Sequence, residues 1–514
     1  MHEPGRNGQP SGRIPHYAAR NLCESVTGSI DEREGRSTLM RIAVLILAAC
    51  LAVQKAPAQH ASSWNRFRGP NGSGVAEGQK PPTRFGPHEN LKWKTDVAAG
   101  QSSPIVAGDN VVLTAWQGGR LLTCAFDRAT GRQAWRADAK VTQTERYQRD
   151  AASPATATPA SDGKRIVVYF GACGLICYDL GGRELWRHKL PIPEIYGDYG
   201  SGVSPIIADG LVVLVRDVAN GSSILAVDAA TGKRVWDVKR LSKVSWCTPV
   251  VWDVEGGRQV VSAGHGAMTG YDLKTGAEKW TVKQMPSGCA SSPVVADGTL
   301  YFAGWSPGAA GDTSSRQPTF DSLLADLDKN KDGALSREEA AKAFGSFFDN
   351  YDLNRDGSVT RDEYDDLIKL LDEGKNGVYA VKPGGSGDIT NTHLLWKRTR
   401  GMGYIPTAIL YRGQLIMVKD GGIVTALDSK TGAALYAERL GAPGEYHASP
   451  VAANGHVYFA SRQGVVTVLK VGPAGAKVVF RSPRLDEKIA ATPAIAGDTL
   501  FVRTNKSLCA FATK

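Results

Sequence analysis

The sequence lacks several motifs that mark common classes of protein. It contains neither a Walker A loop nor an H-E-x-x-H motif, so a P-loop nucleotide hydrolase and a zinc metalloprotease are without support. Its eight cysteines include no C-x-x-C, C-x-x-C-H or adjacent Cys-Cys pair, which also leaves haem attachment and zinc ribbons without support. Cys173 and Cys177 are close enough in sequence to pair across a hairpin, and buried free thiols are the alternative.

Clusters of like charge are also absent. The formal charge is +10 over 514 residues, but no run of five or six basic residues occurs. We therefore expect no nucleic-acid partner, because no nucleic-acid-binding motif accompanies the charge. The scattered positive charge leaves a peripheral association with an anionic membrane surface open.

The longest apolar run is too short to cross a bilayer. It spans 42–53, follows Met40-Arg41 and precedes an A-x-A site at 56–58. This order is typical of a secretory signal, and predicts a natural start at Met40 and a mature protein that begins near Gln59. We expect an exported, periplasmic and monomeric protein. The alternatives are an extracellular protein and a lipid anchor at Cys50, the last residue of Leu47-Ala-Ala-Cys50.

Glycine is plentiful, at 58 residues, and marks an internal repeat. A proline, apolar residues and a polar-Gly turn recur, mostly every 43 to 46 residues, with one spacing of 55 and one of 113. The repeats are anchored at Pro104, Pro159, Pro205, Pro249, Pro293, Pro406, Pro450 and Pro493. The long gap indicates an insertion of about 70 residues in a regular array.

A second anchor follows each first one and ends in an aromatic residue. Its clearest form is Asp127-Arg-Ala-Thr-Gly131 followed by Trp135. The aromatic recurs at Trp186, Trp236, Trp280, Trp396, Tyr436 and Phe480. Asp caps the turn and Gly supplies the positive φ.

This unit predicts four short antiparallel strands. One sheet of that size cannot bury both faces, so the sheets are expected to pack radially, with the aromatic in the seam between blades. The sequence therefore predicts an all-β, eight-bladed β-propeller. The eighth unit lacks its last strand, and 91–97 is expected to supply it and close the ring.

The A-x-D-x-x-T-G-x-x-x-W unit resembles the repeat of pyrroloquinoline-quinone (PQQ) propellers and of their non-enzymatic BamB-like relatives. The resemblance covers residues 64–514 apart from the insertion. The opening segment Trp64-Asn-Arg-Phe-Arg-Gly-Pro-Asn-Gly72 is also similar to the leader of exported PQQ-like propeller proteins. These repeats identify a fold rather than an activity.

The insertion contains two segments that match the EF-hand calcium loop. They begin 24 residues apart, a spacing closer to dockerin-like pairs than to a calmodulin lobe. The predicted ligands are Asp328, Asn330, Asp332, Ala334, Ser336 and Glu339 in the first loop, and Asp352, Asn354, Asp356, Ser358, Thr360 and Glu363 in the second. Ala334 and Ser358 bind through their carbonyls.

The flanks of both loops have helical apolar spacing. Leu335 and Val359 are expected to pair as a short strand, and one helix over about 337–351 is expected to join the loops. Ser336 with Glu339 and Thr360 with Glu363 form capping boxes. We interpret calcium as structural or as a docking aid rather than as a switch. Calcium-dependent attachment to a carbohydrate-linked partner is a weaker alternative.

The resemblance places any ligand site of a PQQ propeller in its central funnel. The residues expected there are Arg149-Asp150, Tyr199-Gly-Ser201, Ser245-Trp-Cys247, Gly288-Cys289, Gly403-Tyr404, Glu445-Tyr-His447 and Lys488. The quinone and calcium ligands of the enzymes cannot be mapped onto these positions, and no catalytic residue is assigned. Glu445 and His447 are an alternative acid–base pair.

Two functional hypotheses follow. The first is a calcium-stabilised scaffold that binds a protein partner or a small ligand in the funnel. The second is a PQQ-dependent dehydrogenase that oxidises an alcohol or a sugar. The predicted organisation has an upstream segment with signal peptide (1–58), a leader (59–90), a first propeller part (91–305), the EF-hand pair (306–375) and the remaining blades (376–514).

Overall fold

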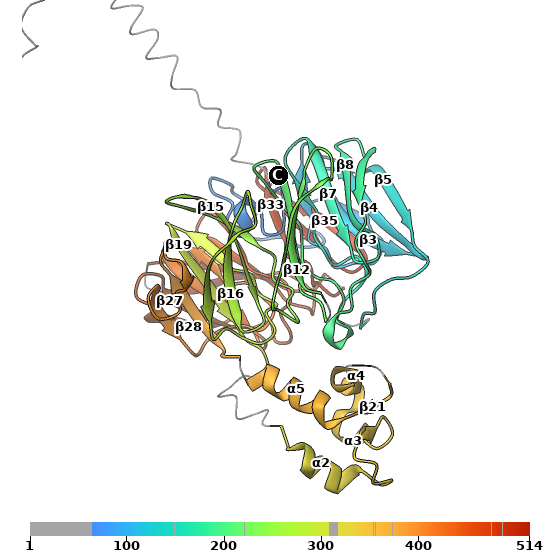
Figure 1. The fold of residues 1–514 in the computed structure, drawn as a ribbon. Helices are drawn as coiled ribbons and strands as arrows, with labels where there is room; N and C mark the ends of the chain where they lie inside the picture. The colour runs from blue at the N-terminus through green and yellow to red at the C-terminus, as the bar shows by residue number, and fades with distance from the viewer. Residues whose placement is uncertain are drawn as a thin grey trace, which may run out of the picture. The chain divides into compact units, whose positions relative to one another are not determined.

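The chain folds as a ring of antiparallel sheets with a small helical insertion. The computed structural model describes residues 64–148, 151–219, 221–307, 317–352, 354, 356–372, 374–473, 475–485 and 487–513. The predicted signal peptide and Cys50 lie outside these residues. Eight sheets stand around a central axis (Figure 1), which confirms the eight-bladed β-propeller. No helix among the described residues has the length and apolar character needed to cross a membrane.

In blades 1 to 4 the four main strands follow one another directly in the sequence. Blade 1 contains β2 (Ile105–Ala107), β3 (Asn110–Gln117), β4 (Arg120–Asp127) and β5 (Gln133–Lys140). Blade 2 contains β6 (Ala160–Ser161), β7 (Arg165–Phe170), β8 (Gly174–Asp179) and β9 (Glu184–His188). Blade 3 contains β10 (Ile206–Ala208), β11 (Leu211–Arg216), β12 (Ser223–Asp228) and β13 (Arg234–Lys239). Blade 4 contains β14 (Val250–Val254), β15 (Gly257–Gly264), β16 (Ala267–Asp272) and β17 (Glu278–Lys283).

Blades 5 to 8 include the interrupted blade and the closing blade. Blade 5 contains β18 (Val294–Ala296), β19 (Thr299–Gly304), β22 (Gly377–Val381) and β24 (Leu394–Arg398). Blade 6 contains β25 (Ile409–Tyr411), β26 (Gln414–Lys419), β27 (Ile423–Asp428) and β28 (Ala434–Arg439). Blade 7 contains β29 (Val451–Ala453), β30 (His456–Ala460), β31 (Val466–Val471) and β32 (Ala476–Arg481). Blade 8 contains β33 (Ala494–Ala496), β34 (Thr499–Arg503), β35 (Ser507–Phe511) and β1 (Leu91–Asp96).

The closing strand confirms the prediction for 91–97. Strand β1 pairs antiparallel with β35, with Trp93 opposite Ala510. Blade 8 therefore joins both ends of the propeller chain, so that its last sheet has no unpaired edge at this position.

A belt of eight hydroxyl side chains surrounds the channel. In each blade one Ser or Thr hydroxyl accepts the backbone N–H of the equivalent residue in the preceding blade, at 2.9–3.1 Å. The hydroxyl belt consists of Ser103, Thr158, Ser204, Thr248, Ser292, Thr407, Ser449 and Thr492, and the bond from Thr492 to Ser103 closes the circle. Each belt residue is buried, so its hydroxyl satisfies a backbone donor that water cannot reach.

The belt explains the sequence repeat and corrects one anchor. In seven blades the belt residue directly precedes the repeated proline. In blade 6 the belt residue is Thr407 and the proline position is occupied by Ala408, because Thr407 makes the equivalent bond to Ser449. The prediction of Pro406 as the anchor was wrong by two positions, since the hydroxyl, not the proline, makes the repeated contact.

Five seams between blades share a tryptophan–glycine contact. The indole Nε1 donates to a carbonyl in the turn of the next blade at 2.9–3.1 Å, and the turn glycine lies against the ring. The pairs are Trp93–Gly131, Trp135–Gly182, Trp186–Gly232, Trp236–Gly276 and Trp396–Gly432. These glycines have positive φ, and a Cβ would come within 2.5–2.7 Å of the indole. Glycine is therefore required by both conformation and space.

The seam between blades 4 and 5 is joined differently. Trp280 donates to Gln259 of its own blade at 2.7 Å. A short strand of the interrupted blade, β23 (Gly387–Asp388), pairs parallel with β17 instead. The N–H of Ile389 donates to Thr281 at 2.9 Å, and Lys283 forms an ion pair with Asp388 at 3.1 Å. Backbone pairing thus replaces the indole contact beside the blade that carries the insertion.

The leader crosses the ring and contacts several blades. It includes the 3-10 turn η1 (Pro70–Gly72). Trp64 accepts the N–H of Val106 in blade 1 at 2.7 Å, and Asn71 exchanges two hydrogen bonds with Val251 in blade 4. Val75 forms a bridge with Ala452 in blade 7. The leader therefore ties blades that are far apart in sequence.

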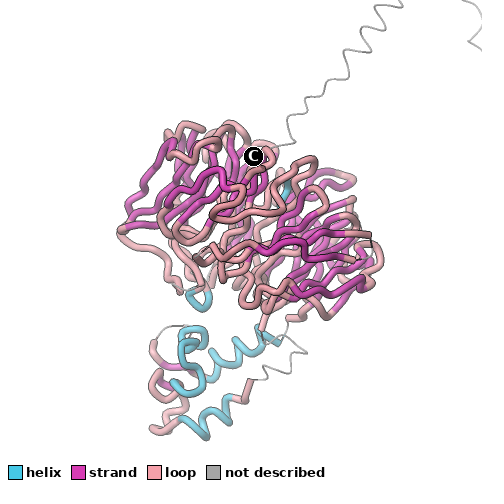
Figure 2. The backbone as a smooth tube through the Cα atoms, turned by 180° about the vertical axis from the view of Figure 1, so that it is seen from behind, coloured by secondary structure: helices cyan, strands magenta, loops and turns pink. Residues whose placement is uncertain are grey.

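Helices gather in the insertion between β19 and β22 (Figure 2). Its elements are α2 (Phe320–Leu327), β20 (Leu335–Ser336), α3 (Ala341–Phe344), η4 (Gly345–Phe347), α4 (Phe348–Tyr351), β21 (Ser358–Val359) and α5 (Arg361–Asp372). The predicted pairing of Leu335 with Val359 is confirmed. The single helix expected over 337–351 is wrong, because Gly345 has φ 50° and separates α3 from the turns that follow.

The insertion has a hydrophobic core of its own. Eight buried side chains form it: Phe320, Leu323, Leu335, Ala340, Phe344, Phe348, Val359 and Tyr364. Phe344 and Tyr351 stack with ring centroids 4.0 Å apart. The core is smaller than each of those in the blades, so we expect the stability of the insertion to depend more on its loops.

Candidate functional site

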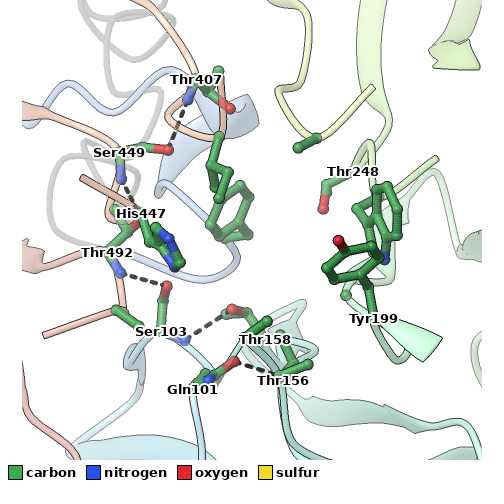
Figure 3. Close-up of a pocket in the computed structure, with 18 of the residues that line it drawn as sticks. Gln101, Ser103, Thr156, Thr158, Tyr199, Thr248, Thr407, His447, Ser449 and Thr492 are labelled. Atoms are coloured by element: carbon green, nitrogen blue, oxygen red, sulfur yellow. Dashed lines mark hydrogen bonds between the residues drawn. The ribbon is translucent and has the colours of Figure 1, made fainter. Parts of the chain in front are cut away.

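A pocket of about 390 Å³ opens in the central channel. Its lining includes every member of the hydroxyl belt except Ser292. Figure 3 shows His447, Ser449 and Thr492 on one side of this pocket and Tyr199 and Thr248 on the other. Phe67 of the leader also lines it.

Aromatic side chains form one wall of the pocket. Tyr199 and Trp246 meet edge to face with centroids 5.8 Å apart, and Tyr404 packs against Trp305 at 5.0 Å. Burial, together with the nearby Tyr199, raises the pKa of Tyr404 to about 12. The Tyr404 phenol is therefore neutral at physiological pH, and this wall presents ring surface with a hydroxyl donor.

The most polar part of the lining holds three ionisable side chains. Arg462 Nη1 forms an ion pair with Glu445 Oε2 at 2.5 Å. Burial and the positive charge of Arg462 lower the pKa of His447 to about 4, although Glu445 acts in the opposite direction. His447 is therefore a neutral imidazole at pH 7. Because Glu445 is engaged by Arg462, an acid–base pair of Glu445 with His447 is not the arrangement found.

The structure brings some of the expected funnel residues together. Tyr199, Trp246, Tyr404, Glu445 and His447 line the pocket. Several others do not contribute to its lining: Ser201, Ser245, Cys247, Gly288, Cys289, Gly403 and Lys488. Arg149 and Asp150 lie outside the described residues.

Sequence reasoning missed other lining residues. Apart from the belt, the polar and aromatic ones are Phe67, Gln101, Gln148, Thr156 and Arg462. The belt hydroxyls carried a visible signal, namely the Ser or Thr that precedes most repeated prolines. Arg462 carried none, because it lies in the turn after β30, the second strand of blade 7, rather than beside the proline anchor.

Blade 5 contains a serine in a sequence pattern typical of hydrolases. Gly304-Trp-Ser306-Pro-Gly308 matches G-x-S-x-G, the nucleophile motif of α/β-hydrolases. Ser306 is 2% exposed, its Oγ accepts the N–H of Ser287 at 3.2 Å, and it follows a propeller strand. This serine therefore holds the chain at the start of the insertion and is not an exposed nucleophile.

The six cysteines of the described residues are all buried and free. Cys173 and Cys177 do not form a disulfide, which settles the alternatives left by the sequence in favour of thiols. Burial raises the pKa of Cys177 to about 12. These thiols act as small apolar side chains rather than nucleophiles.

The first EF-hand loop folds around its own carboxylates. Asp328 Oδ2 accepts the N–H of Gly333 at 3.1 Å, and Glu339 Oε2 accepts the N–H of Ser336 at 3.0 Å. Asp332 Oδ1 accepts the N–H of Ala334, and Asn330 Oδ1 accepts the N–H of Asp332, both at 2.9 Å. These bonds involve all six predicted ligand residues of the first loop.

The second loop repeats this pattern. Gly357 donates to Asp352 Oδ2 at 3.1 Å, and Thr360 donates through its N–H to Glu363 Oε2 at 2.9 Å. The other two repeated bonds run from Asp356 to Asn354 and from Ser358 to Asp356. The two loops make the same hydrogen bonds at the same positions, so we expect both to bind the same kind of ligand.

Asp352 supplies the observation that tests the fit of a cation. It is 3% exposed, and its Oδ1 is buried without a hydrogen-bond partner among the described residues. An unpartnered buried carboxylate oxygen in an all-oxygen loop fits a hard cation such as Ca²⁺. The described His, Cys, Asp and Glu side chains do not by themselves converge into a metal cage of three or more, so the ligand assignment is a proposal.

The fold and these loops define the class as an eight-bladed propeller of PQQ-like repeats with an inserted EF-hand pair. The family described as outer membrane protein assembly factor BamB matches residues 123–319 and 419–514, more than half of the chain. The chain belongs to this family. The EF-hand family matches residues 320–339 and 344–368.

Solved structures with the same fold include a BamB protein and two dehydrogenases. BamB from Moraxella catarrhalis is 14% identical, with 82% of this chain and 98% of that chain covered and a TM-score of 0.50. Quinohemoprotein alcohol dehydrogenase from Comamonas testosteroni is 12% identical, with 89% and 82% covered and a TM-score of 0.52. A europium-containing methanol dehydrogenase is 9% identical, with 88% and 99% covered and a TM-score of 0.54. No curated protein matches. At these identities the likeness shows the fold alone.

Proposed function

We propose that this protein is an exported, calcium-binding scaffold whose central funnel holds a protein segment or a small ligand without catalysis. The observation that carries the proposal is the chemistry of the funnel lining. It combines an aromatic wall with amide and hydroxyl groups, and Glu445 is its single carboxylate among the described residues. Such a lining suits recognition by ring contacts and hydrogen bonds.

The second candidate is a PQQ-dependent dehydrogenase, which the fold shared with two dehydrogenases favours. A quinone site of that kind needs several oxygen ligands for its cation. The described lining contains no Asp or Asn, and its one carboxylate is paired with Arg462. These residues do not fit a metal–quinone pair, so we derive no reaction for the funnel.

Titration of PQQ into the mature chain with excess calcium tests the choice. Trp246 lines the pocket, so a ligand bound there should quench its fluorescence, and Trp246→Phe is the control for the ten other tryptophans of the chain. We expect no saturable quenching and no dye-linked oxidation of alcohols or sugars. Micromolar binding lost in Trp246→Phe, together with turnover, would establish the dehydrogenase and refute the scaffold.

The same proposal assigns calcium to the insertion. The side chains of Asp328, Asn330, Asp332, Ser336 and Glu339, with the carbonyl of Ala334, would hold one ion. Asp352, Asn354, Asp356, Thr360 and Glu363, with the carbonyl of Ser358, would hold the second. For exported modules, dissociation constants on the order of 10⁻⁴ to 10⁻³ M are typical. Calorimetric titration should detect two sites, and failure of Glu339→Gln plus Glu363→Gln to weaken binding would refute the assignment.

A further inference from the structure

Buried arginines with no acidic partner are the starting observation. Arg68 is 0% exposed and Arg503 is 1% exposed, and neither forms an ion pair with any described Asp or Glu. Arg240, by contrast, has an acidic partner: its guanidinium contacts Asp217 at 2.7 Å, and both side chains are buried. A buried charge without hydrogen bonds or a counter-charge is strongly unfavourable. Arg68 and Arg503 therefore need another source of stabilisation.

Arg503 obtains it from the backbone. Its Nη1 donates to the carbonyls of Ser102 and Thr114, both at 2.8 Å, and to Ser102 Oγ at 2.7 Å. Its Nη2 donates to the carbonyl of Ala98 at 3.3 Å. Both nitrogens Nη1 and Nη2 thus have a partner, and of the five N–H donors of a guanidinium only the one on Nε and the second one on Nη2 have none among the described residues. Carbonyl dipoles thus surround this cation.

Arg68 lacks such a shell. Its Nη2 donates to the carbonyl of Ala408 at 2.9 Å and to that of Ser73 at 3.2 Å. Its Nε and Nη1 are buried with no hydrogen-bond partner among the described residues, which leaves three of its five N–H donors unused. Burial alone lowers its pKa to about 9, so the side chain still carries its charge at neutral pH.

The surrounding backbone is shaped around this guanidinium. Gly74 has φ +76°, and a Cβ there would lie 2.7 Å from Arg68 Nη2. The N–H of Gly74 donates to the carbonyl of Arg68 at 2.8 Å. The leader thus folds back over the Arg68 guanidinium. The charged group lies between the leader and the start of the first strand of blade 6. The unused donors are held in place rather than free to turn toward water.

We propose that Arg68 is a binding site for a small monovalent anion, with chloride as the ion, at the junction of the leader and blade 6. The anion would accept the unused N–H donors and supply the missing counter-charge. It would thereby fasten the leader, which carries Phe67 into the funnel, to the ring. The inference is independent of what the funnel binds.

Thermal unfolding in different salts tests the site. The mature chain is compared in sodium chloride and in sodium gluconate at equal ionic strength, with calcium chelated. We expect chloride to raise Tm by about 1–3 °C, because an ion that binds only the folded state stabilises it. Arg68→Met should remove this difference, and Arg503→Met should keep it, because Arg503 is already surrounded by carbonyls. Equal Tm values for the natural chain in both salts would overturn the proposal.

A second measurement does not depend on the variant folding. Crystals grown in sodium bromide should show an anomalous peak within hydrogen-bonding reach of Arg68 Nε or Nη1. A water molecule in that position, with no anomalous signal, would overturn the site even if the salts shifted Tm.

Discussion

The blades and the insertion reach stability in different ways. Each blade repeats the same few contacts, a belt hydroxyl and in five seams an indole on a glycine, and these contacts close on themselves around the ring. The insertion has eight core side chains and two loops whose carboxylates point inward. The blades thus form a framework that closes on itself, whereas we propose that an external cation completes the insertion.

The largest effect expected on the framework comes from a seam glycine. Gly232→Ala would place a Cβ 2.5 Å from Trp186 at φ +70°, and we expect it to cost about 3 kcal/mol through overpacking and strain. Gly210→Ala is the matched control, with φ +76° and no atom within 4 Å, and should cost about 1 kcal/mol. Denaturant unfolding measures both. Equal costs would mean that the indole contact is not the reason for glycine.

The hydroxyl belt should respond next. Thr158→Val keeps the side-chain volume but leaves the N–H of Ser103 without its acceptor, which should cost about 2 kcal/mol. Thr467→Val is the control, because Thr467 is fully buried and its Oγ1 has no partner among the described residues. If both variants unfold at the same denaturant concentration, the belt bond contributes nothing. Calcium binding by the insertion should remain unchanged in both.

Calcium should stabilise the insertion rather than the blades. With 1 mM free Ca²⁺ and a dissociation constant on the order of 10⁻⁴ M, the insertion should gain about 1.5 kcal/mol. Limited proteolysis within 320–368, with and without a chelator, measures this gain. Glu363→Gln should reduce it and Glu338→Gln should not, because Glu338 is not a loop ligand. Equal protection by calcium in both variants would contradict the assignment of Glu363.

The smallest expected effect concerns pH at the funnel. His447 has its pKa lowered to about 4 by burial and Arg462, so the unfolded chain binds the proton more readily. Its contribution to stability is present above the unfolded pKa of about 6.5 and is lost as pH falls toward 4. The natural chain should lose about 0.7 kcal/mol more than His447→Gln between pH 7 and pH 6. Parallel curves for the two chains would contradict the neutral, buried imidazole.

The repeat allowed the fold to be predicted from sequence because the belt hydroxyl, the turn glycine and the aromatic are local signals with a fixed period. The insertion loops could be predicted too, because their ligand residues occupy fixed positions within a short segment. The contacts of Phe67 and Arg462 with the funnel were not, since they depend on how distant segments meet. Trp280 has the sequence signal of a seam residue, yet it bonds to Gln259. The five turns that receive an indole begin with Asp, and blade 5 has Lys382-Pro-Gly-Gly385 at this place.

Hydrogen–deuterium exchange of the mature chain, with calcium and with a chelator, tests the central claim most directly. The account predicts that calcium slows exchange in peptides from 320–368 and leaves peptides from the eight blades unchanged. An insertion that exchanges at the same rate in both conditions, or an equal slowing in all blades, would contradict a self-sufficient ring that carries a calcium-dependent insertion.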